Sequence, residues 1–467
     1  MLRKVKKSVC AGLDVHKDNV WACVGIKDPT SRKEIIRYST KKFSSNYSDL
    51  VSMCEWMRQQ VAKFYSPELV PAFDVFMEST GKYSTPVYNV IEEQGLQPFI
   101  VNPRHVKTIN GQKTDQKDCC WIAQLGQEGL ITPSYIPEKR IRELRRLSRT
   151  RTKLVQARGN DIRRIQNVLT EANIRIDLIF SDMQGQSAQA VIRYLLETEE
   201  PTLQEVRSRI HSGCSIVKYR NIADRKEKEG KLLKAFEGAS FSSSQKFELR
   251  SALTRIDQYS EQIISYENMM KEMLEPYKCE LDILETIPGI SSLSAMQILA
   301  EIGADMSRFK NSDSFVNWCG LCPARNSSNG KHKSVKIGKG GQYLKPVLTQ
   351  CALNAIRHPY FKKKYESIAR RRGKKRALIA ICRKIMVCVY HMLKTGEIFQ
   401  PSDMTENSEV RTAPEKKKIT AVKDQLIEYI RTTDTVGKDL VDLALNILKK
   451  AEHQMQGTNN LGQFQIE

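Results

Sequence analysis

The amino-acid sequence predicts a mixed α/β domain at the start of the chain and a mainly helical remainder. Over residues 1–137, short runs of β-favouring apolar residues alternate with segments whose apolar residues recur at helical spacing, which is typical of an α/β layer sandwich. After residue 137 the composition changes to long, charged stretches with a narrow apolar stripe, which indicates long helices. We expect four regions: 1–137, 138–278, 279–400 and a polar helical extension over 401–467.

The first region is expected to gather polar side chains at the ends of its strands. Its predicted elements are a β-hairpin over 8–24, a helix over 46–64, a short buried strand over 75–77, a helix from 78 to 90, a strand over 97–102 and a helix from 115. In such folds the loops at strand ends converge while the sheet fixes their positions. Residues distant in sequence can therefore meet there.

Four carboxylates lie at the ends of these elements. Asp115 and Asp118 are three residues apart, so on a helix they project from one face about 5–6 Å apart. Asp14 lies near the end of the first strand, and Glu78 ends the strand over 75–77. Carboxylates packed together repel one another unless cations neutralise them. Two Mg²⁺ about 4 Å apart would do so, and would also activate the attacking oxygen and stabilise the leaving oxygen of a phosphodiester.

Each carboxylate also has an ordinary structural explanation. Asp115 can be a helix N-cap, Asp14 a turn residue and Glu78 a solvated strand end. The prediction of a divalent metal site, for Mg²⁺ or Mn²⁺, rests on the set of four, on their places at element ends and on the basic remainder of the chain.

The overall charge predicts a polyanionic partner. The 467 residues include 75 Lys and Arg against 53 Asp and Glu, a formal net charge of +22, and such a chain binds polyanions by releasing their counterions. Nucleic acid is the leading partner. A membrane surface is disfavoured because no apolar run approaches about 18 residues and the first residues lack a signal pattern. We expect a soluble intracellular protein.

The cysteines are expected to be structural. Twelve cysteines scattered over a chain of this length are typical of buried small hydrophobes in a reducing compartment. Cys319 and Cys322 form a CxxC pair, which can hold zinc or a redox pair. No second CxxC and no paired histidines accompany it, so an apolar element end is the favoured interpretation.

Two predicted helices in the second region carry a narrow apolar stripe between charged residues. They cover about 140–154 and 247–274, and the pattern favours an antiparallel helical hairpin or an intermolecular coiled coil. The first is rich in arginine, so Arg145 and Arg146 are candidates for phosphate contact. The intervening stretch, 184–246, is expected to be an inserted helical subdomain.

The third region combines a Pro-Gly turn with two basic segments. Pro288-Gly289 between two helical patterns is typical of a helix-hairpin-helix, whose turn amides can face a phosphate, or of a plain αα-hairpin. The loop over 318–341 is rich in glycine and lysine, which favours binding of a phosphate or its transition state. Its serines can be nucleophiles or turn residues. The loop candidates for nucleic-acid contact are Arg325, Lys331, Lys333, Lys336 and Lys339, and those of the basic segment over 370–376 are Arg371 and Lys374.

These motifs resemble those of the IS110 family, the DEDD transposases of bacterial insertion sequences that work with a bridge RNA. The resemblance covers roughly residues 8–399. Its N-terminal motifs are Gly-Leu-Asp14-Val-His-Lys, Met-Glu78-Ser-Thr-Gly-Lys-Tyr, Val-Asn-Pro-Arg and Lys-Thr-Asp115-Gln-Lys-Asp118. They match the family's RuvC-like (RNase H-like) domain and its four metal ligands.

The C-terminal motifs resemble the family's serine transposase domain. They are Ile-Pro-Gly-Ile, Ala-Glu-Ile-Gly, the box Gly320-Leu-Cys-Pro323, a serine and Lys-Gly-Gly. The family's nucleophilic serine stands five residues after that proline, which corresponds to Ser328, and Ser327 is the second candidate. Where the family usually has Ser-Gly, this chain has Ser328-Asn329-Gly330.

The resemblance implies a recombinase that uses a structured noncoding bridge RNA to pair donor and target DNA. In the family, carboxylates of one subunit act with the serine of another through a covalent 5′-phosphoserine. A homo-oligomer, dimer or tetramer, in the bacterial cytoplasm at the nucleoid is therefore expected, with the long helices supplying subunit contacts. Two alternatives stay open: a RuvC-like junction nuclease that uses only carboxylates and water, and a non-enzymatic nucleic-acid scaffold.

Overall fold

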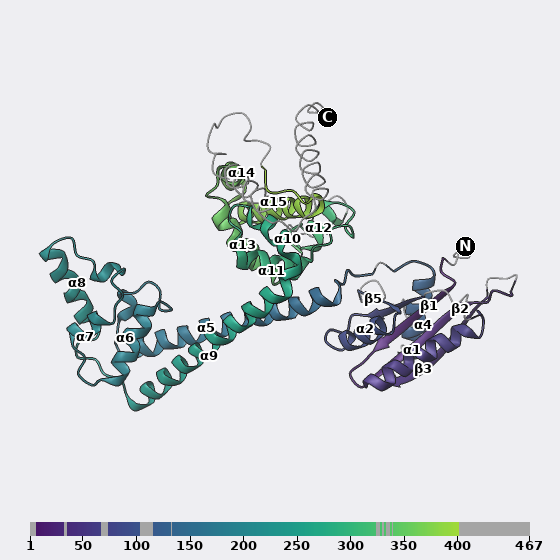
Figure 1. Cartoon of the computed structure of the whole chain (residues 1–467), viewed down its shortest axis with the longest axis horizontal. Helices are drawn as coiled ribbons and strands as arrows, with labels where there is room; N and C mark the ends of the chain where they lie inside the picture. Colours follow the sequence, from purple (N-terminus) through teal and green to yellow (C-terminus); the bar gives the residue numbers. More distant parts are fainter. Residues whose placement is uncertain are drawn as a thin grey trace, which may run out of the picture. The chain divides into compact units, whose positions relative to one another are not determined.

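The computed structural model describes residues 6–31, 35–66, 73–102, 115–131, 133–323, 327–328, 331–332, 337–338 and 340–400 (Figure 1). Every structural statement below concerns these residues. The predicted extension over 401–467 and the predicted contact residues Arg325, Lys333, Lys336 and Lys339 lie outside them.

The N-terminal region is built on a five-stranded mixed sheet. Its strands stand in the order β3-β2-β1-β4-β5, with β1–β2 and β2–β3 antiparallel and β1–β4 and β4–β5 parallel. The bounds are β1 Val9–Val15, β2 Asn19–Lys27, β3 Ile36–Ser44, β4 Asp74–Glu78 and β5 Gln97–Val101. The predicted mixed α/β layering is confirmed.

Alternation along β1 divides its side chains between two helical layers. Val9, Leu13 and their odd-numbered neighbours pack with α1 (Tyr47–Ala62) and α2 (Ser84–Glu93) on one face. Even-numbered positions face α4 (Asp115–Gln127), where Cys10 packs with the apolar side of that helix. Asp14 is even-numbered and therefore lies on the α4 face.

The structure differs from the sequence prediction at two places in this region. The edge strand β3 was not predicted, because only Phe43 in it is buried and its other residues give no apolar alternation. Helix α2 begins at Ser84 rather than at Glu78, because Gly81 takes φ +67°, which is outside the helical range.

The second region contains two long helices that run side by side within the chain (Figure 1). They are α5 (Lys139–Glu171) and α9 (Ser243–Leu274), and they are antiparallel: Arg140 donates to the Met273 carbonyl at one end, and Arg255 pairs with Asp161 toward the other. The predicted intramolecular hairpin is observed, whereas an intermolecular coiled coil stays a prediction.

The stretch predicted to be an inserted subdomain is helical and shares a core with the ends of the two long helices. The elements are η2 Ile176–Leu178, α6 Gln186–Glu197, α7 Leu203–Ser208, η3 Ser215–Val217 and α8 Ile222–Lys234. Their buried apolar side chains form one cluster with Ile162 and Ile165 of α5 and with Leu249 and Leu253 of α9.

The third region is mainly helical around a separate core. Its elements are η4 Glu275–Tyr277, α10 Lys278–Glu285, α11 Ser292–Ile302, α12 Ser312–Trp318, β6 Ser327–Ser328, β7 Lys331–His332, α13 Leu344–Ala355, α14 Pro359–Arg372 and α15 Lys374–Thr395. Phe315, Phe361 and Tyr390 are among its largest buried side chains, and Ile141 and Leu274 join the same core. Over the described part of the chain, none of the helices has the length and apolar character needed to span a membrane.

The Pro-Gly turn between α10 and α11 packs against α13. Gly289 takes φ +93°, and a Cβ there would come within 2.5 Å of the Cys351 carbonyl oxygen and 2.6 Å of the Ala355 nitrogen. This contact with backbone explains the glycine without any ligand. A contact of the turn with phosphate stays a prediction.

Candidate active site

Strand pairing places Asp14 and Glu78 next to each other at one edge of the sheet. β1 and β4 are adjacent and parallel, and Leu13 pairs with Met77, so the following residues of the two strands lie at the same level. Leu13 and Met77 both belong to the core on the α1 and α2 face. By alternation, Asp14 and Glu78 point to the face that α4 covers.

Close packing at Gly12 brings the first turn of α4 over the end of β1. A Cβ on Gly12 would lie 2.2 Å from the Cys119 carbonyl oxygen and 2.4 Å from the Ala123 nitrogen, so any larger residue would push the helix away. Asp115 and Asp118 occupy that first turn. The glycine two residues before Asp14 thus allows carboxylates from two distant segments to approach each other.

The structure brings Asp14, His16 and Asp115 together. The Nε2 atom of His16 lies 3.1 Å from Oδ2 of Asp14 and 3.6 Å from Oδ2 of Asp115. One ligand atom from each of these three residues lies within 4.8 Å of the other two. Asp14 is buried, whereas His16 and Asp115 are exposed, so the group opens to solvent on one side.

The electrostatics of Asp14 extend the group to Asp118. Burial raises the pKa of the Asp14 carboxyl, His16 opposes that rise by charge and hydrogen bonding, and the charges of Asp115 and Asp118 add to it. Asp118 is thus close enough to repel Asp14. In the part of the chain that is described, however, neither Glu78 nor Asp118 belongs to the group of ligand atoms within 4.8 Å.

The donor set fits a divalent cation. Carboxylate oxygens suit Mg²⁺ and Mn²⁺, and an imidazole nitrogen is a common ligand of transition metals, so two carboxylates with His16 favour Mn²⁺ as much as Mg²⁺. Burial is the main cause of the raised pKa of Asp14, and the carboxylate repulsion that adds to it is what a bound cation would relieve. Prediction from sequence missed His16. The available signal was its position two residues after Asp14, which places both on the same face of an extended strand.

The loop that carries the predicted nucleophile is held at its base by glycines. Ser328 lies in β6 and pairs with Lys331 of β7. The side chains of both residues lie outside the description. Farther back, Pro323 bridges to Ile337, and the Gly338 amide donates to the Cys322 carbonyl at 3.1 Å.

At the base of the loop, two backbone segments cross so closely that only glycine fits. A Cβ on Gly341 would come within 2.2 Å of the Cys319 carbonyl oxygen, and one on Gly320 within 2.5 Å of the Gly340 carbonyl oxygen. Both residues have positive φ, 64° and 74° respectively. The CxxC pair is thus part of this closure: Cys319 is buried, as expected for an apolar element end, and Cys322 accepts through its backbone.

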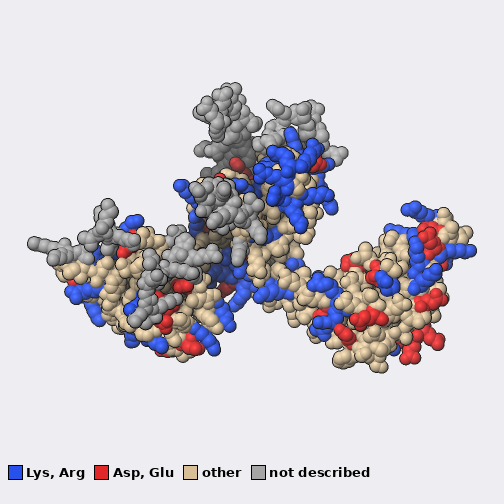
Figure 2. All heavy atoms as spheres, turned by 180° about the vertical axis from the view of Figure 1, so that it is seen from behind, with Lys and Arg blue, Asp and Glu red and all other residues tan. Residues whose placement is uncertain are grey.

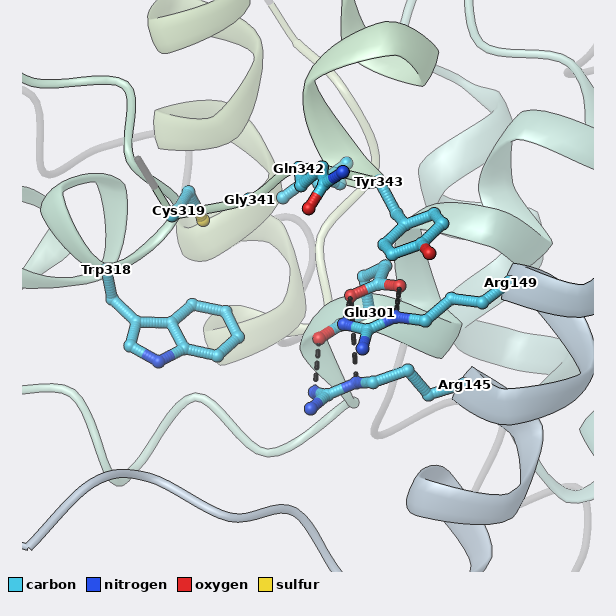
Figure 3. Close-up of a pocket in the computed structure, with 10 residues that line it drawn as sticks. Arg145, Arg149, Glu301, Trp318, Cys319, Gly341, Gln342 and Tyr343 are labelled. Atoms are coloured by element: carbon cyan, nitrogen blue, oxygen red, sulfur yellow. Dashed lines mark hydrogen bonds and ion pairs between the residues drawn. The ribbon is translucent and has the colours of Figure 1, made fainter. Parts of the chain in front are cut away.

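A cavity of about 350 Å³ lies beside the loop base (Figure 3). Arg149 of α5 makes a bidentate pair with the buried Glu301 of α11 at 2.7 and 2.8 Å, and its guanidinium stacks over the Tyr343 ring. Arg145 donates to the Ala300 and Glu301 carbonyls, which ties α5 to the last turn of α11. The guanidinium of Arg145 thus already has protein partners. Its contact with nucleic acid stays a prediction.

Three further residues predicted to bind nucleic acid, Arg146, Arg371 and Lys374, are exposed. Arg146 lies on the open side of α5, and residues 370–376 at the junction of α14 and α15 are all exposed, including Arg371 and Lys374. Lys and Arg side chains gather over α14 in Figure 2. This surface suits contact with a polyanion.

Two family models match the chain. A model for the DEDD transposase domain of IS110 type, described as a transposase, matches residues 11–174. A second, described as transposase IS116/IS110/IS902 family, matches residues 281–366, and the two together cover more than half of the chain. The chain belongs to the IS110 family of transposases. A search among curated proteins gave no match.

Membership of the IS110 family makes the chain a DNA transposase, and the DEDD type of its first domain indicates use of a divalent metal. The first match includes Asp14, Glu78, Asp115 and Asp118, and the second includes Ser328. Residues 184–246 lie outside both matches, as does the extension after residue 400. The predicted carboxylate site and the predicted serine nucleophile of this IS110 transposase therefore both lie in the parts of the chain that match the family models.

Proposed function

We propose that this transposase is an RNA-guided recombinase that cleaves and rejoins DNA through a covalent phosphoserine, with help from a divalent metal. The observation that carries the proposal is that Asp14 and His16, at the end of β1, meet Asp115 of the first turn of α4. Such a group can hold a divalent cation beside a phosphodiester, and a transposase cleaves phosphodiesters in DNA. The guide RNA would hold the sequence information that the protein does not contain.

The carboxylates would hold the cation while the serine reacts. Asp14 and Asp115, assisted by His16 and with Glu78 and Asp118 beside them, provide the ligands. A bound divalent cation polarises the phosphodiester and stabilises the charge of the transition state. The buried Asp14 and its hydrogen bond to His16 fix one side of this arrangement, because a half-buried pair keeps its geometry better than exposed side chains.

Ser328 would supply the nucleophile. Its hydroxyl oxygen gives up its proton and forms a bond to the phosphorus as the bond to the 3′ oxygen breaks. The departing 3′ oxygen takes up a proton, which leaves a 5′-phosphoserine and a free 3′-hydroxyl. Attack by a 3′-hydroxyl on the phosphoserine reverses these steps and joins a new pair of ends. The backbone closure at Gly320 and Gly341 would hold the loop in place for this reaction.

The serine would come from a second copy of the chain. α5 and α9 form the arm for such contact, and Ile264 and Met269 of α9 are exposed, at 58% and 48%. The basic residues on α5 and at the junction of α14 and α15 would hold RNA and DNA backbones.

The decisive experiment compares Ser328→Ala with Asp115→Asn in a cleavage assay with RNA, donor DNA and target DNA. If the proposal is right, both variants lose strand cleavage, and Ser328→Ala also lacks the covalent protein–DNA adduct that wild type shows after denaturation. Ser327→Ala serves as the matched control and should keep both. A junction nuclease would still cut after Ser328→Ala, and a scaffold would behave the same after Asp115→Asn.

RNA guidance is tested separately. Protein purified at moderate salt should carry a discrete noncoding RNA, which sequencing would identify. Replacing its unpaired guide segments should redirect recombination to the matching DNA. Recombination at unchanged sites after removal of the RNA would contradict this part of the proposal and leave the serine mechanism standing.

A further inference from the structure

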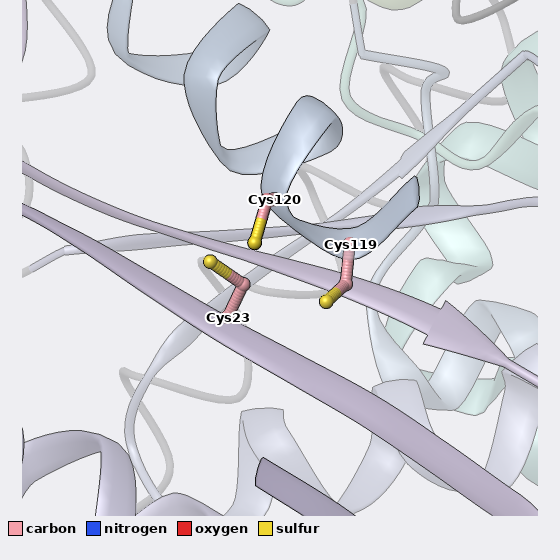
Figure 4. Close-up of side chains that lie close together, drawn as sticks. All are labelled: Cys23, Cys119 and Cys120. Atoms are coloured by element: carbon pink, nitrogen blue, oxygen red, sulfur yellow. The ribbon is translucent and has the colours of Figure 1, made fainter. Parts of the chain in front are cut away.

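Three cysteine sulfurs meet between β2 and α4. Cys23 lies on β2, and Cys119 and Cys120 reach toward it from α4 (Figure 4). The three Sγ atoms all lie within 4.8 Å of one another. They come from segments almost 100 positions apart, so the fold, rather than local sequence, brings them together.

The three sulfurs lie in a small space that is closed on all sides but one. Cys23 pairs across the sheet with Gly12, which has no side chain to fill the space under α4. Cys23 and Cys119 are fully buried and pack with Ala123, whereas Cys120 is half-buried and gives the group one side toward solvent. A cation could enter from that side.

The geometry suits a thiophilic cation. In a tetrahedral zinc site the Zn–S distance of about 2.3 Å places the sulfurs about 3.8 Å apart, so the thiols need to approach by an ångström at most. Within the described chain no histidine or carboxylate joins the group, so water on the open side would be the fourth ligand.

We propose that Cys23, Cys119 and Cys120 form a second metal site, which takes a soft divalent cation such as Zn²⁺. Each coordinating thiol releases its proton to solvent, and neither the sulfur nor the cation changes oxidation state. Soft thiolates select Zn²⁺ over Mg²⁺, whereas carboxylates do the opposite, so this site and the group at Asp14 take different ions.

The cation would fasten the first turns of α4 to β2. Cys119 follows Asp118 directly, and Asp115 lies one helical turn before it. A bond from Cys119 and Cys120 through the cation to Cys23 would therefore restrain the turn that presents these carboxylates. This site stands on its own geometry and does not depend on the phosphoserine mechanism.

The test uses the full-length protein, reduced and freed of metal by a chelator, with Co²⁺ as a coloured probe for Zn²⁺. Wild type should bind Co²⁺ at the three cysteines with an intense sulfur-to-cobalt charge-transfer band that Zn²⁺ abolishes. Cys120→Ala should weaken this binding by about 100-fold or more, since even outer-shell partners are worth about 10–100-fold. Cys23→Ala should do the same.

Three control variants isolate the site. Cys54→Ala removes a buried cysteine of α1 in the same region and should keep the band. Asp115→Asn should keep it as well, because a carboxylate site gives no sulfur band. The double variant Cys319→Ala/Cys322→Ala should keep it if the CxxC pair is only structural.

Folding of the variants is checked by thermal unfolding without metal. Zn²⁺ should raise the Tm of wild type and of Cys54→Ala, and it should raise the Tm of Cys120→Ala by clearly less. The proposal is overturned if the band persists in Cys120→Ala and Cys23→Ala, or if it disappears in the CxxC variant. It is also overturned if mass spectrometry finds a disulfide between Cys23 and Cys120 in protein that takes up no metal.

Discussion

Gly12 of β1 lies directly under Cys119 of α4, so closely that a Cβ on the glycine would come within 2.2 Å of the cysteine carbonyl oxygen. The contact is between two backbones, and neither can yield by rotating a side chain. It sets the distance between the sheet and the helix whose first turn carries Asp115 and Asp118. The candidate metal site thus depends on the absence of one methyl group.

The first prediction concerns this contact. Gly12→Ala should lower the free energy of unfolding by about 1–3 kcal/mol, because overpacking forces the helix away from the strand. It should also weaken Mn²⁺ binding. Gly159→Ala in α5 is the control: nothing lies within 4 Å of a Cβ there, so the helix should gain roughly 0.5–1 kcal/mol. Urea unfolding measures both, and equal effects of the two variants would contradict the account of Gly12.

The second prediction concerns His16, the site residue that prediction from sequence missed. His16→Ala should weaken Mn²⁺ binding and slow DNA cleavage by about 10–100-fold, the usual effect of losing a ligand partner. Electron paramagnetic resonance of Mn²⁺ gives the affinity. His211→Ala, an exposed histidine of the inserted subdomain, should change neither quantity. Full Mn²⁺ affinity in His16→Ala would remove the imidazole from the site.

The third prediction concerns pH and the ion pair between the long helices. Hydrogen bonds from Arg255 hold the pKa of the Asp161 carboxyl below its ordinary value, with Arg164 adding to the effect. The stability contributed by this pair is therefore fully present above the unfolded-state pKa of about 3.9 and is lost as the pH falls through the lower folded-state value. Asp161 is 5% exposed, and Asp161→Asn should cost about 1–3 kcal/mol at pH 7.

Urea unfolding at pH 7 and near pH 3 checks this linkage. The difference in unfolding free energy between wild type and Asp161→Asn should shrink at the lower pH, because wild type then begins to lose its charge. Glu227→Gln, which breaks an exposed pair with Lys231 within α8, should have little effect at either pH. A difference that grows on acidification would show that the sign of the linkage is wrong.

The fourth prediction concerns the basic junction of α14 and α15. Arg371→Gln and Lys374→Gln should each weaken binding to DNA and RNA of any sequence, and each should reduce the slope of log K against log salt by about 1. Fluorescence anisotropy over a range of salt concentrations gives the slope. Lys231→Gln, whose charge is paired with Glu227, is the matched control. A loss confined to one sequence would mean base recognition instead of backbone contact.

The sequence was informative wherever a local pattern decides the structure. Alternation and helical spacing located β1, β2, β4, β5 and the long helices, because these elements bury one face. The strand β3 was missed because it buries almost nothing, and the start of α2 was misplaced because Gly81 leaves the helical range. The pairing of β3 with β2 is not visible in the residue pattern of β3 itself, and the positive φ of Gly81 is one that a glycine allows but does not require.

The candidate site could be predicted only in outline. The places of Asp14, Glu78, Asp115 and Asp118 at element ends follow from the pattern, and the structure adds that Asp14 and Asp115 meet at His16. The meeting of Cys23 with Cys119 and Cys120 had no local signal, since it depends on the register of β2 against β1 and on the close approach at Gly12. Contacts of this kind appear only when the chain is folded.

The antiparallel course of α5 and α9 has a consequence for how such a protein can change over time. A helix of 33 residues is about 50 Å long, and removing about seven residues, or two whole turns, from the middle of both helices would shorten the arm and keep the faces that enter the two cores in line. Paired deletions or insertions of whole turns can thus change the length of the hairpin of α5 and α9.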